Sequence, residues 1–228
     1  MTGIIIQARM GSRRFPDKMM ALLHGIPIIE WVIRRTKRAK LADMVILATS
    51  IHKENDILEV KAHELGIEVF RGSEDDVLER FALAANTFQL ETIVRVCADN
   101  PLVCPDELDK LIYFYREQHP DYAFNIIPKL DNRYPDGLGG EIVSNKILQE
   151  LHQTVVLKEE REHFFNHIWN NAKHFTIATF KADAAIAHPE IRLDVNNHND
   201  LDYLNGYEFD VQDTGTKIIR RIVNARVI

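Results

Sequence analysis

A cluster of basic residues follows an apolar run near the start of the chain, in the segment IIIQARMGSRRFPDK (residues 4–18). Its cations are Arg9, Arg13, Arg14 and Lys18, and they alternate with Gly11, Ser12 and Pro16. Arg and Lys side chains bind phosphate oxygens, as do the backbone N–H groups that a glycine-containing turn exposes. The glycine–lysine–serine ending of a P-loop is absent. The segment therefore predicts a polyphosphate site of another type, with a solvated basic loop as the alternative.

Two segments contain candidate ligands for a cation. Asp99 follows the apolar run TIVRVCA (92–98), and Asp194 and Asn196 lie in RLDVNNHND (192–200). A carboxylate that faces a phosphate site from a strand end suits Mg²⁺. Residues two apart on a strand share one face, so Asp194 and Asn196 would point the same way. The alternative for Asp99 is that it is an ordinary turn residue. Asp200 is predicted to start a helix.

The composition excludes several classes of protein. The chain has 228 residues, 46% hydrophobic residues and a net charge of −6, which argues against a general binder of nucleic acids or anionic membranes. Two cysteines, Cys97 and Cys104, provide neither a disulfide framework nor a zinc pattern. No apolar run reaches transmembrane length. We expect a cytoplasmic protein with neither a nucleic-acid nor a membrane partner.

Strand and helix signals alternate through the first half of the chain. Short β-branched runs predict strands at 3–8, 43–50, 67–72 and 92–98, and helical periodicity predicts helices at 27–40, 53–66, 73–88 and 105–119. Pro27 would open the first helix and Ser73 would cap the third. This alternation predicts an α/β fold in which helices cover both faces of a mostly parallel sheet. Ligands bind beyond the carboxyl ends of such strands, where the basic segment and Asp99 would share one crevice.

The alternation weakens after about residue 120. Turn signals fill 125–144, helices are expected at 144–154 and 159–172, strands at 174–182 and 190–195, and a helical stretch from about Asn199. We expect one domain over residues 1–228, with a turn-rich excursion at about 121–170 that serves sugar binding or dimerisation.

These residues resemble the signature of the cytidylyltransferases that activate acidic sugars. In that signature an Arg, a Ser, an Arg, a Pro and a Lys recur at fixed spacing, here Arg9, Ser12, Arg14, Pro16 and Lys18. Further matching pieces follow in order: VILATS (45–50), FRGSEDDVLERF (70–81), VRVCADNPLVCPDELD (94–109), YPDGL (134–138) and EREH (160–163). The resemblance covers nearly the whole chain. It is strongest to the branch of the spore-coat polysaccharide biosynthesis protein F.

The resemblance implies a fold, a reaction and a set of site residues. The fold is the three-layer α/β/α sandwich of the nucleotide-diphospho-sugar transferases, and the reaction joins CTP and a sugar to give a CMP-sugar and pyrophosphate. Arg14, Lys18 and Asp99 would be catalytic, with Asp99, Asp194 and Asn196 holding Mg²⁺. Nucleotide binding would involve Ala8, Arg9, Met10, Gly11, Ser12, Arg14, Lys18, Arg71 and Ser73. Sugar binding would involve Arg161, Glu162 and His163, and the family predicts a homodimer.

The chain departs from the family pattern at two places. Asn196 stands where relatives usually have an aspartate, and Gly139 and Gly140 follow PDGL where the branch tends to have an acidic residue. Two alternatives stay open: a sugar-1-phosphate nucleotidyltransferase of the same fold, and a nucleotide-binding protein with impaired catalysis. The sequence does not identify the sugar. Its carboxylate could meet Arg71, Arg133 or Arg161.

Overall fold

A computed structural model describes residues 1–12 and 14–225, so Arg13 lies outside the described residues. Seven strands of the described chain form one sheet in the order β5-β4-β1-β6-β8-β7-β9. Their bounds are β1 (Thr2–Gln7), β4 (Met44–Ser50), β5 (Glu68–Gly72), β6 (Thr92–Cys97), β7 (Tyr122–Phe124), β8 (Glu141–Ser144) and β9 (Ile177–Ala178). Only β8 runs antiparallel to its neighbours in this sheet, which confirms the mostly parallel arrangement.

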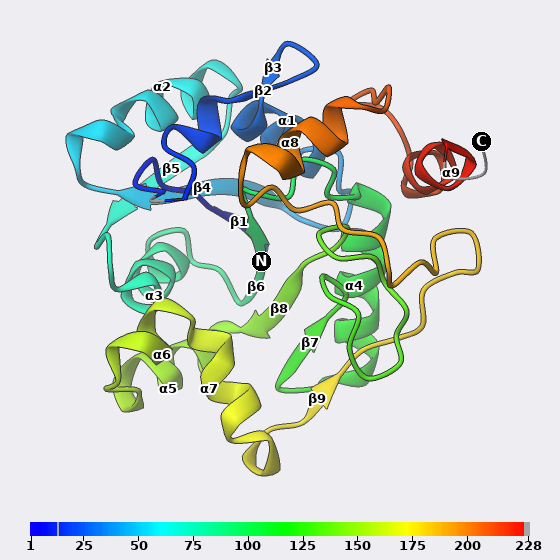
Figure 1. The fold of residues 1–228 in the computed structure, drawn as a ribbon. Coiled ribbons are helices and arrows are strands. Elements are labelled where there is room, and N and C mark those ends of the chain that lie inside the picture. Colours follow the sequence, from blue (N-terminus) through cyan, green and yellow to red (C-terminus); the bar gives the residue numbers. More distant parts are fainter. Residues whose placement is uncertain (13, 226–228) are drawn as a thin grey trace.

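Helices cover both faces of the sheet, as Figure 1 shows. One face packs against α1 (Ile28–Thr36), α2 (Asp56–Glu64), α4 (Pro105–Gln118), α8 (His198–Asn205) and α9 (Gly215–Ala225). The other packs against α3 (Val77–Thr87), α5 (Asn145–Thr154) and α7 (Phe164–Asn170). The alternation of a strand decides which side chain joins which core: Ile4 and Ile6 point to the first and Ile5 to the second. The three-layer α/β/α architecture is therefore confirmed.

Short elements complete the chain. They are the hairpin of β2 (Leu22–Leu23) and β3 (Ile26–Pro27), the helix α6 (Lys158–Glu162), and the 3₁₀ turns η1 (Lys18–Met20), η2 (Lys53–Asn55) and η3 (Ala172–His174). The segment 121–170 supplies β7 and β8 to the main sheet and α5, α6 and α7 to one face. Its role in sugar binding or dimerisation stays a prediction.

At two helix starts, the capping residue differs from the sequence-based expectation. The helix expected at 73–88 begins at Val77, because the side chain of Asp76 accepts the Glu79 N–H at 2.9 Å and acts as its cap. Ser73 instead accepts the N–H of Asp76 at 3.0 Å in the preceding turn. Pro27 precedes α1 as its N-cap residue and pairs with Leu22 in the hairpin.

The second half of the chain is less regular than expected. Residues 190–195 form no strand: Arg192 makes one isolated bridge, to Asp136. The strand expected at 174–182 shrinks to β9, and the helix expected at 159–172 breaks at His163, whose backbone (φ −120°, ψ 59°) is not helical. The prediction that Asp200 starts a helix is correct, because Asp200 and Asn197 form a reciprocal capping box at α8.

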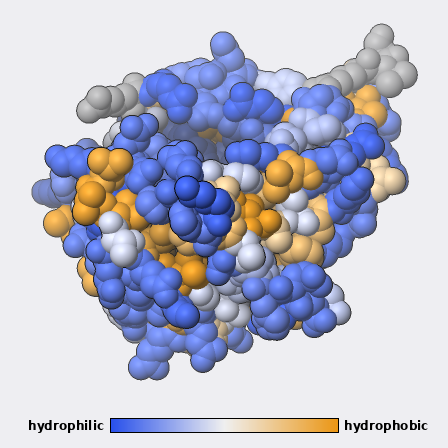
Figure 2. Space-filling model, turned by 90° about the horizontal axis from the view of Figure 1, so that it is seen from below, coloured by the Kyte–Doolittle hydropathy of each residue, from blue (hydrophilic) through white to orange (hydrophobic). Residues whose placement is uncertain are grey.

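No helix within the described ranges is long and apolar enough to cross a membrane. On the face shown in Figure 2, hydrophobic residues form several separate areas among mainly hydrophilic ones. Single exposed apolar side chains, such as Val156 and Leu157, are ordinary features of a protein surface.

Candidate active site

A cleft of about 790 Å³ opens beyond the carboxyl ends of β1 and β6, the place expected for a parallel sheet. Half of the residues that line it are ones the sequence had singled out. These are Ala8, Arg9, Gly11, Ser12, Arg14, Lys18, Asp99, Glu162 and His163. The structure thus brings the basic segment and the strand-end aspartate to one crevice.

One wall of the cleft comes from Ala8, Arg9, Gly11, Ser12, Arg14 and Lys18. We call the segment 8–18 that contains them the phosphate-binding loop, after the role that its sequence predicts. The N–H of Met10 donates to Asn55 at 2.8 Å and that of Ser12 to the Met10 carbonyl at 2.7 Å, which fixes the backbone. Within the described chain, the N–H groups of Arg9 and Gly11 have no protein acceptor. A Cβ at Gly11 would come within 3.2 Å of carboxylate oxygens of both Glu54 and Glu74, so only glycine fits without displacing them.

Lys18 connects three segments that are distant in the sequence. Its ammonium lies 3.2 Å from the Asp99 carboxylate and donates to the carbonyl oxygen of Val195 at 2.8 Å. The N–H of Val195 donates in turn to the carbonyl of Asp99 at 2.8 Å. The Lys18 side chain is 10% exposed, so its charge is held at a fixed place on the cleft wall.

The second acidic segment lies beside Asp99, although it is not a strand. Asn196 accepts a hydrogen bond from Arg14 at 3.1 Å and donates to the carboxylate of Asp194, which also pairs with Arg192 at 2.7 Å. Asp136, which the sequence analysis did not single out, belongs to the same cluster. Burial, together with the negative charge of Asp194, raises the pKa of Asp136 to about 6.

The donor chemistry of this cluster suits a hard divalent cation. The candidate ligands Asp99, Asp194 and Asn196 offer oxygen atoms only, which Mg²⁺ prefers. No three His, Cys, Asp or Glu side chains of residues 1–12 and 14–225 gather into a complete metal site. In proteins, Mg²⁺ is commonly held by one or two carboxylates together with substrate phosphates.

The opposite wall of the cleft comes from α6 and the turn that follows it. Glu162 accepts a hydrogen bond from Arg9 at 2.9 Å, and Glu74 lies 3.5 Å from the same guanidinium. His163 lines the cleft at the break between α6 and α7. Two of the three residues assigned to the sugar therefore face the phosphate-binding loop across the cleft.

Asp194 and Asn196 are not among the residues that line the cleft, and neither are four other assigned residues. Arg71 donates to the Ser50 and His52 carbonyls and pairs with Asp56 and Glu59 at 2.7 and 2.6 Å. Arg161 pairs with Asp76 at 2.6 Å and donates to two carbonyls. Met10 and Ser73 act through the turns described above. The assignment of these four residues to substrate binding rests on the resemblance alone.

The cleft lining also contains nine residues that the sequence analysis had not assigned to a site, among them Gln7, Arg95 and Cys97. Arg95 and Cys97 precede Asp99 by four and two residues, so strand alternation, which places all three on one side of β6, was the available signal. Burial raises the pKa of the Cys97 thiol to about 12. The thiol therefore stays protonated and is unsuited to act as a nucleophile.

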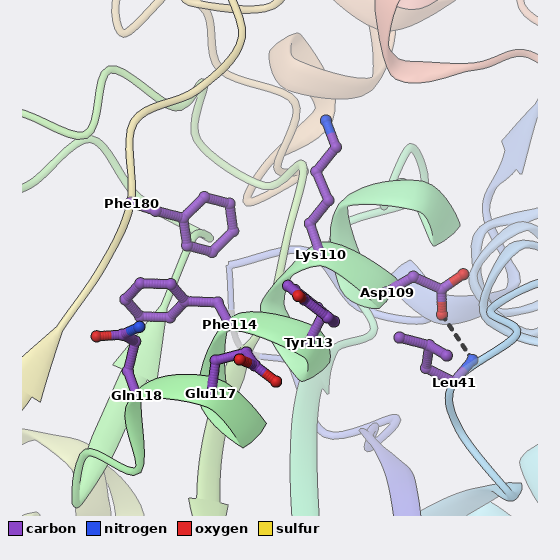
Figure 3. Close-up of a pocket in the computed structure, with 8 residues that line it drawn as sticks. All are labelled: Leu41, Asp109, Lys110, Tyr113, Phe114, Glu117, Gln118 and Phe180. Carbon is purple, nitrogen blue, oxygen red and sulfur yellow. Dashed lines mark hydrogen bonds between the residues drawn. The ribbon is translucent and has the colours of Figure 1, made fainter.

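A second hollow, of about 610 Å³, lies on the outer face of α4 (Figure 3). The rings of Phe114 and Phe180 lie together on one side of it, and Asp109 on the other accepts the N–H of Leu41 at 2.8 Å. Its lining lacks the convergent cations and acids of the cleft. It is not the candidate active site.

Sequence comparisons agree with this geometry. The profile of the cytidylyltransferase family matches residues 3–203. An uncharacterised protein of Methanocaldococcus jannaschii is 33% identical over 86% of this chain and 79% of its own length. The spore coat polysaccharide biosynthesis protein SpsF of Bacillus subtilis is 30% identical over 87% of this chain and 82% of its own. The chain belongs to the cytidylyltransferase family and is a nucleotidyltransferase.

Solved structures show the same fold. A cytidylyltransferase from Leptospira borgpetersenii superposes with a TM-score of 0.90 at 26% identity, covering 99% of this chain and 95% of its own. A CMP-2-keto-3-deoxy-manno-octonic acid synthetase complexed with CTP has a TM-score of 0.68 at 16% identity, covering 90% of this chain and 97% of its own. The second similarity is one of fold.

Proposed function

We propose that this enzyme transfers the CMP group of CTP to a hydroxyl of an acidic sugar and releases pyrophosphate in an Mg²⁺-dependent reaction. One observation carries the proposal: Lys18 joins the phosphate-binding loop to Asp99 in the cleft lining and to the 192–200 segment beside it. The acidic acceptor and a role in surface polysaccharide synthesis follow the family resemblance and the name of the Bacillus subtilis relative. We further propose a cytoplasmic location and a homodimer.

The cleft residues have distinct tasks in this reaction. Arg14, Lys18 and the free N–H groups of Arg9 and Gly11 bind phosphate oxygens and position the triphosphate. Asp99 and Asp194 would hold Mg²⁺, which supplies further charge neutralisation at those oxygens when bound. The acceptor hydroxyl oxygen attacks the α-phosphorus and its proton passes to solvent. The bond from the α-phosphorus to the bridging oxygen breaks, and pyrophosphate leaves with that electron pair beside Lys18 and Arg14.

A thermal-shift series tests the nucleotide half first. CTP, UTP, ATP, GTP and dTTP are each added with and without Mg²⁺. A ligand at a hundred times its Kd adds about 2.7 kcal/mol to stability, which is about 5–10 °C in Tm for a chain of this size. We expect CTP with Mg²⁺ to give the largest shift.

The outcomes separate the alternatives. A preference for UTP or dTTP would move the protein to the sugar-1-phosphate nucleotidyltransferases. Stabilisation by CTP without pyrophosphate release from any of a panel of sugar acids would indicate a nucleotide-binding protein with impaired catalysis. No shift with any nucleotide would contradict the phosphate site itself.

A further inference from the structure

We propose that Arg95 is the residue that binds the carboxylate of the acceptor sugar, an inference that rests on the function proposed above. Arg95 lies in β6 and lines the cleft. Among the Lys and Arg side chains that line the cleft in the described chain, it alone lies outside the phosphate-binding loop. The other three, Arg9, Arg14 and Lys18, are placed to meet the triphosphate.

The guanidinium of Arg95 is fixed on three sides. Its Nε donates to Gln7 Oε1 at 2.8 Å and its Nη1 to Glu141 Oε2 at 2.7 Å. The rings of Phe164 and Phe165 lie 5.5 and 5.6 Å from the guanidinium carbon. No acceptor for Nη2 is found among residues 1–12 and 14–225, and 12% of the side chain is exposed. Because Arg95 lines the cleft, Nη2 is the guanidinium nitrogen left to bind a ligand there.

Glu141 fixes the position of the Arg95 guanidinium. This carboxylate is 7% exposed and also accepts the hydroxyl of Tyr122 at 2.7 Å. Because both oxygens have buried partners, Glu141 keeps its place and Arg95 keeps its own. A guanidinium already fixed in this way loses little rotamer entropy when it binds an anion.

The arginines suggested by the sequence are poorly placed for the same task. Arg71 and Arg161 donate hydrogen bonds to carbonyls and carboxylates outside the cleft lining. Arg133 is exposed and does not line the cleft. A carboxylate of an acceptor seated between β6 and the α6–α7 break would meet Arg95 instead.

A purely structural explanation exists, since Arg95 and Glu141 are direct partners in the antiparallel pairing of β6 and β8. The two explanations differ in what a double substitution restores. Arg95→Met leaves Glu141 buried without its counter-ion and lowers stability. Arg95→Met/Glu141→Gln removes both charges and keeps an oxygen that can accept the buried Tyr122 hydroxyl, so much of that loss should be restored. If the pair is purely structural, the double variant should regain acceptor binding together with stability. If Arg95 binds the acceptor, the double variant should regain stability alone.

The experiment measures pyrophosphate release with CTP and Mg²⁺, using 3-deoxy-manno-octulosonate and N-acetylneuraminate as acceptor probes. A thermal shift by each acid in the presence of CTP is measured in parallel. We expect Arg95→Met to raise the KM for the acid, or weaken its binding, roughly 10- to 100-fold, the effect of losing one charge-assisted hydrogen bond. The shift produced by CTP alone should stay unchanged. Arg116→Met, at an exposed arginine of α4 outside the cleft lining, is the control.

The double variant decides the question. Recovery of Tm without recovery of the acid KM or affinity supports the inference, and recovery of both overturns it. Wild-type protein that binds CTP but neither acid also overturns the inference and leaves the nucleotide half of the proposed function standing. Wild-type protein that binds no CTP contradicts the proposed function and, with it, this inference.

Discussion

The ammonium of Lys18 lies 3.2 Å from the Asp99 carboxylate, although 81 positions separate the two residues. Lys18 also donates to Val195, so one side chain joins the phosphate-binding loop, the end of β6 and the 192–200 segment. Basic and acidic parts of the cleft therefore hold each other in place. A ligand that displaces Lys18 from either contact would act on both parts together.

Lys18→Met tests the basic half of this contact. Because the methionine stem fills a similar space, the fold should persist, while the charge beside the departing pyrophosphate is lost. We expect a fall in kcat of about 100- to 1,000-fold, as for other groups that stabilise transition-state charge. Pyrophosphate release with CTP and a sugar acid measures it. Lys53→Met, an exposed lysine outside the cleft lining, is the control, and equal rates for the two variants would contradict the assignment.

Asn196→Asp tests the acidic half. Chelation of divalent cations with EDTA should abolish activity in the wild-type protein. The substitution adds a negative charge beside Asp194, so the Mg²⁺ concentration for half-maximal activity should fall several-fold. Asn197→Asp adds the same charge one residue away, at the N-cap of α8, where Asn and Asp cap equally well. An identical response to the two substitutions would argue against Asn196 as a ligand.

The sequence predicted the elements whose patterns are local. The apolar runs of β1 and β6 are buried on both faces, so composition alone marks them as parallel strands, and the strand-end rule then places Asp99 opposite the basic loop. Residues 190–195 alternate apolar and charged side chains, which is also a strand pattern. They fail to form a strand because their partner is the irregular segment around Asp136, which offers one bridge rather than a ladder.

The missed site residues depend on contacts that no local pattern contains. Arg95 is recognisable as a candidate only from the tertiary structure, because its guanidinium is fixed by Glu141, a residue 46 positions away in another strand. Conversely, Arg161 belongs to the family-like EREH motif, yet its guanidinium turns to Asp76 and away from the cleft lining. Motif membership predicts a neighbourhood, whereas the direction of a long side chain depends on its tertiary partners.

Arg161→Met should therefore act on stability rather than on the acceptor. Its partner Asp76 caps α3 and is 28% exposed, so solvent reduces the cost of breaking the pair. We expect a loss of about 1–3 kcal/mol in the free energy of unfolding, below the range for fully buried pairs. Denaturant unfolding measures this loss. A large rise in the acceptor KM at unchanged stability would return Arg161 to the sugar site.

Gly137→Ala tests whether the backbone of YPDGL positions the acidic cluster. Gly137 has φ +86°, and a Cβ there would lie 3.1 Å from both Asn100 Oδ1 and the Asp194 N–H nitrogen. Strain and crowding together should cost about 2–4 kcal/mol, or about 5–15 °C in Tm. Gly25→Ala is the matched control, because Gly25 has φ +76° with nothing within 4 Å of the added Cβ. It should lose only about 1 kcal/mol from conformational strain.

Activity distinguishes the two alanine variants further. The crowding at Gly137 falls on the segment that carries Asp194, so Gly137→Ala should also need more Mg²⁺ for half-maximal pyrophosphate release when assayed well below its Tm. Gly25→Ala should match the wild-type protein in the same assay. Equal Tm losses and equal Mg²⁺ requirements in the two variants would show that Gly137 serves only its own turn. The placement of Asp194 would then have to come from its contacts with Arg192 and Asn196.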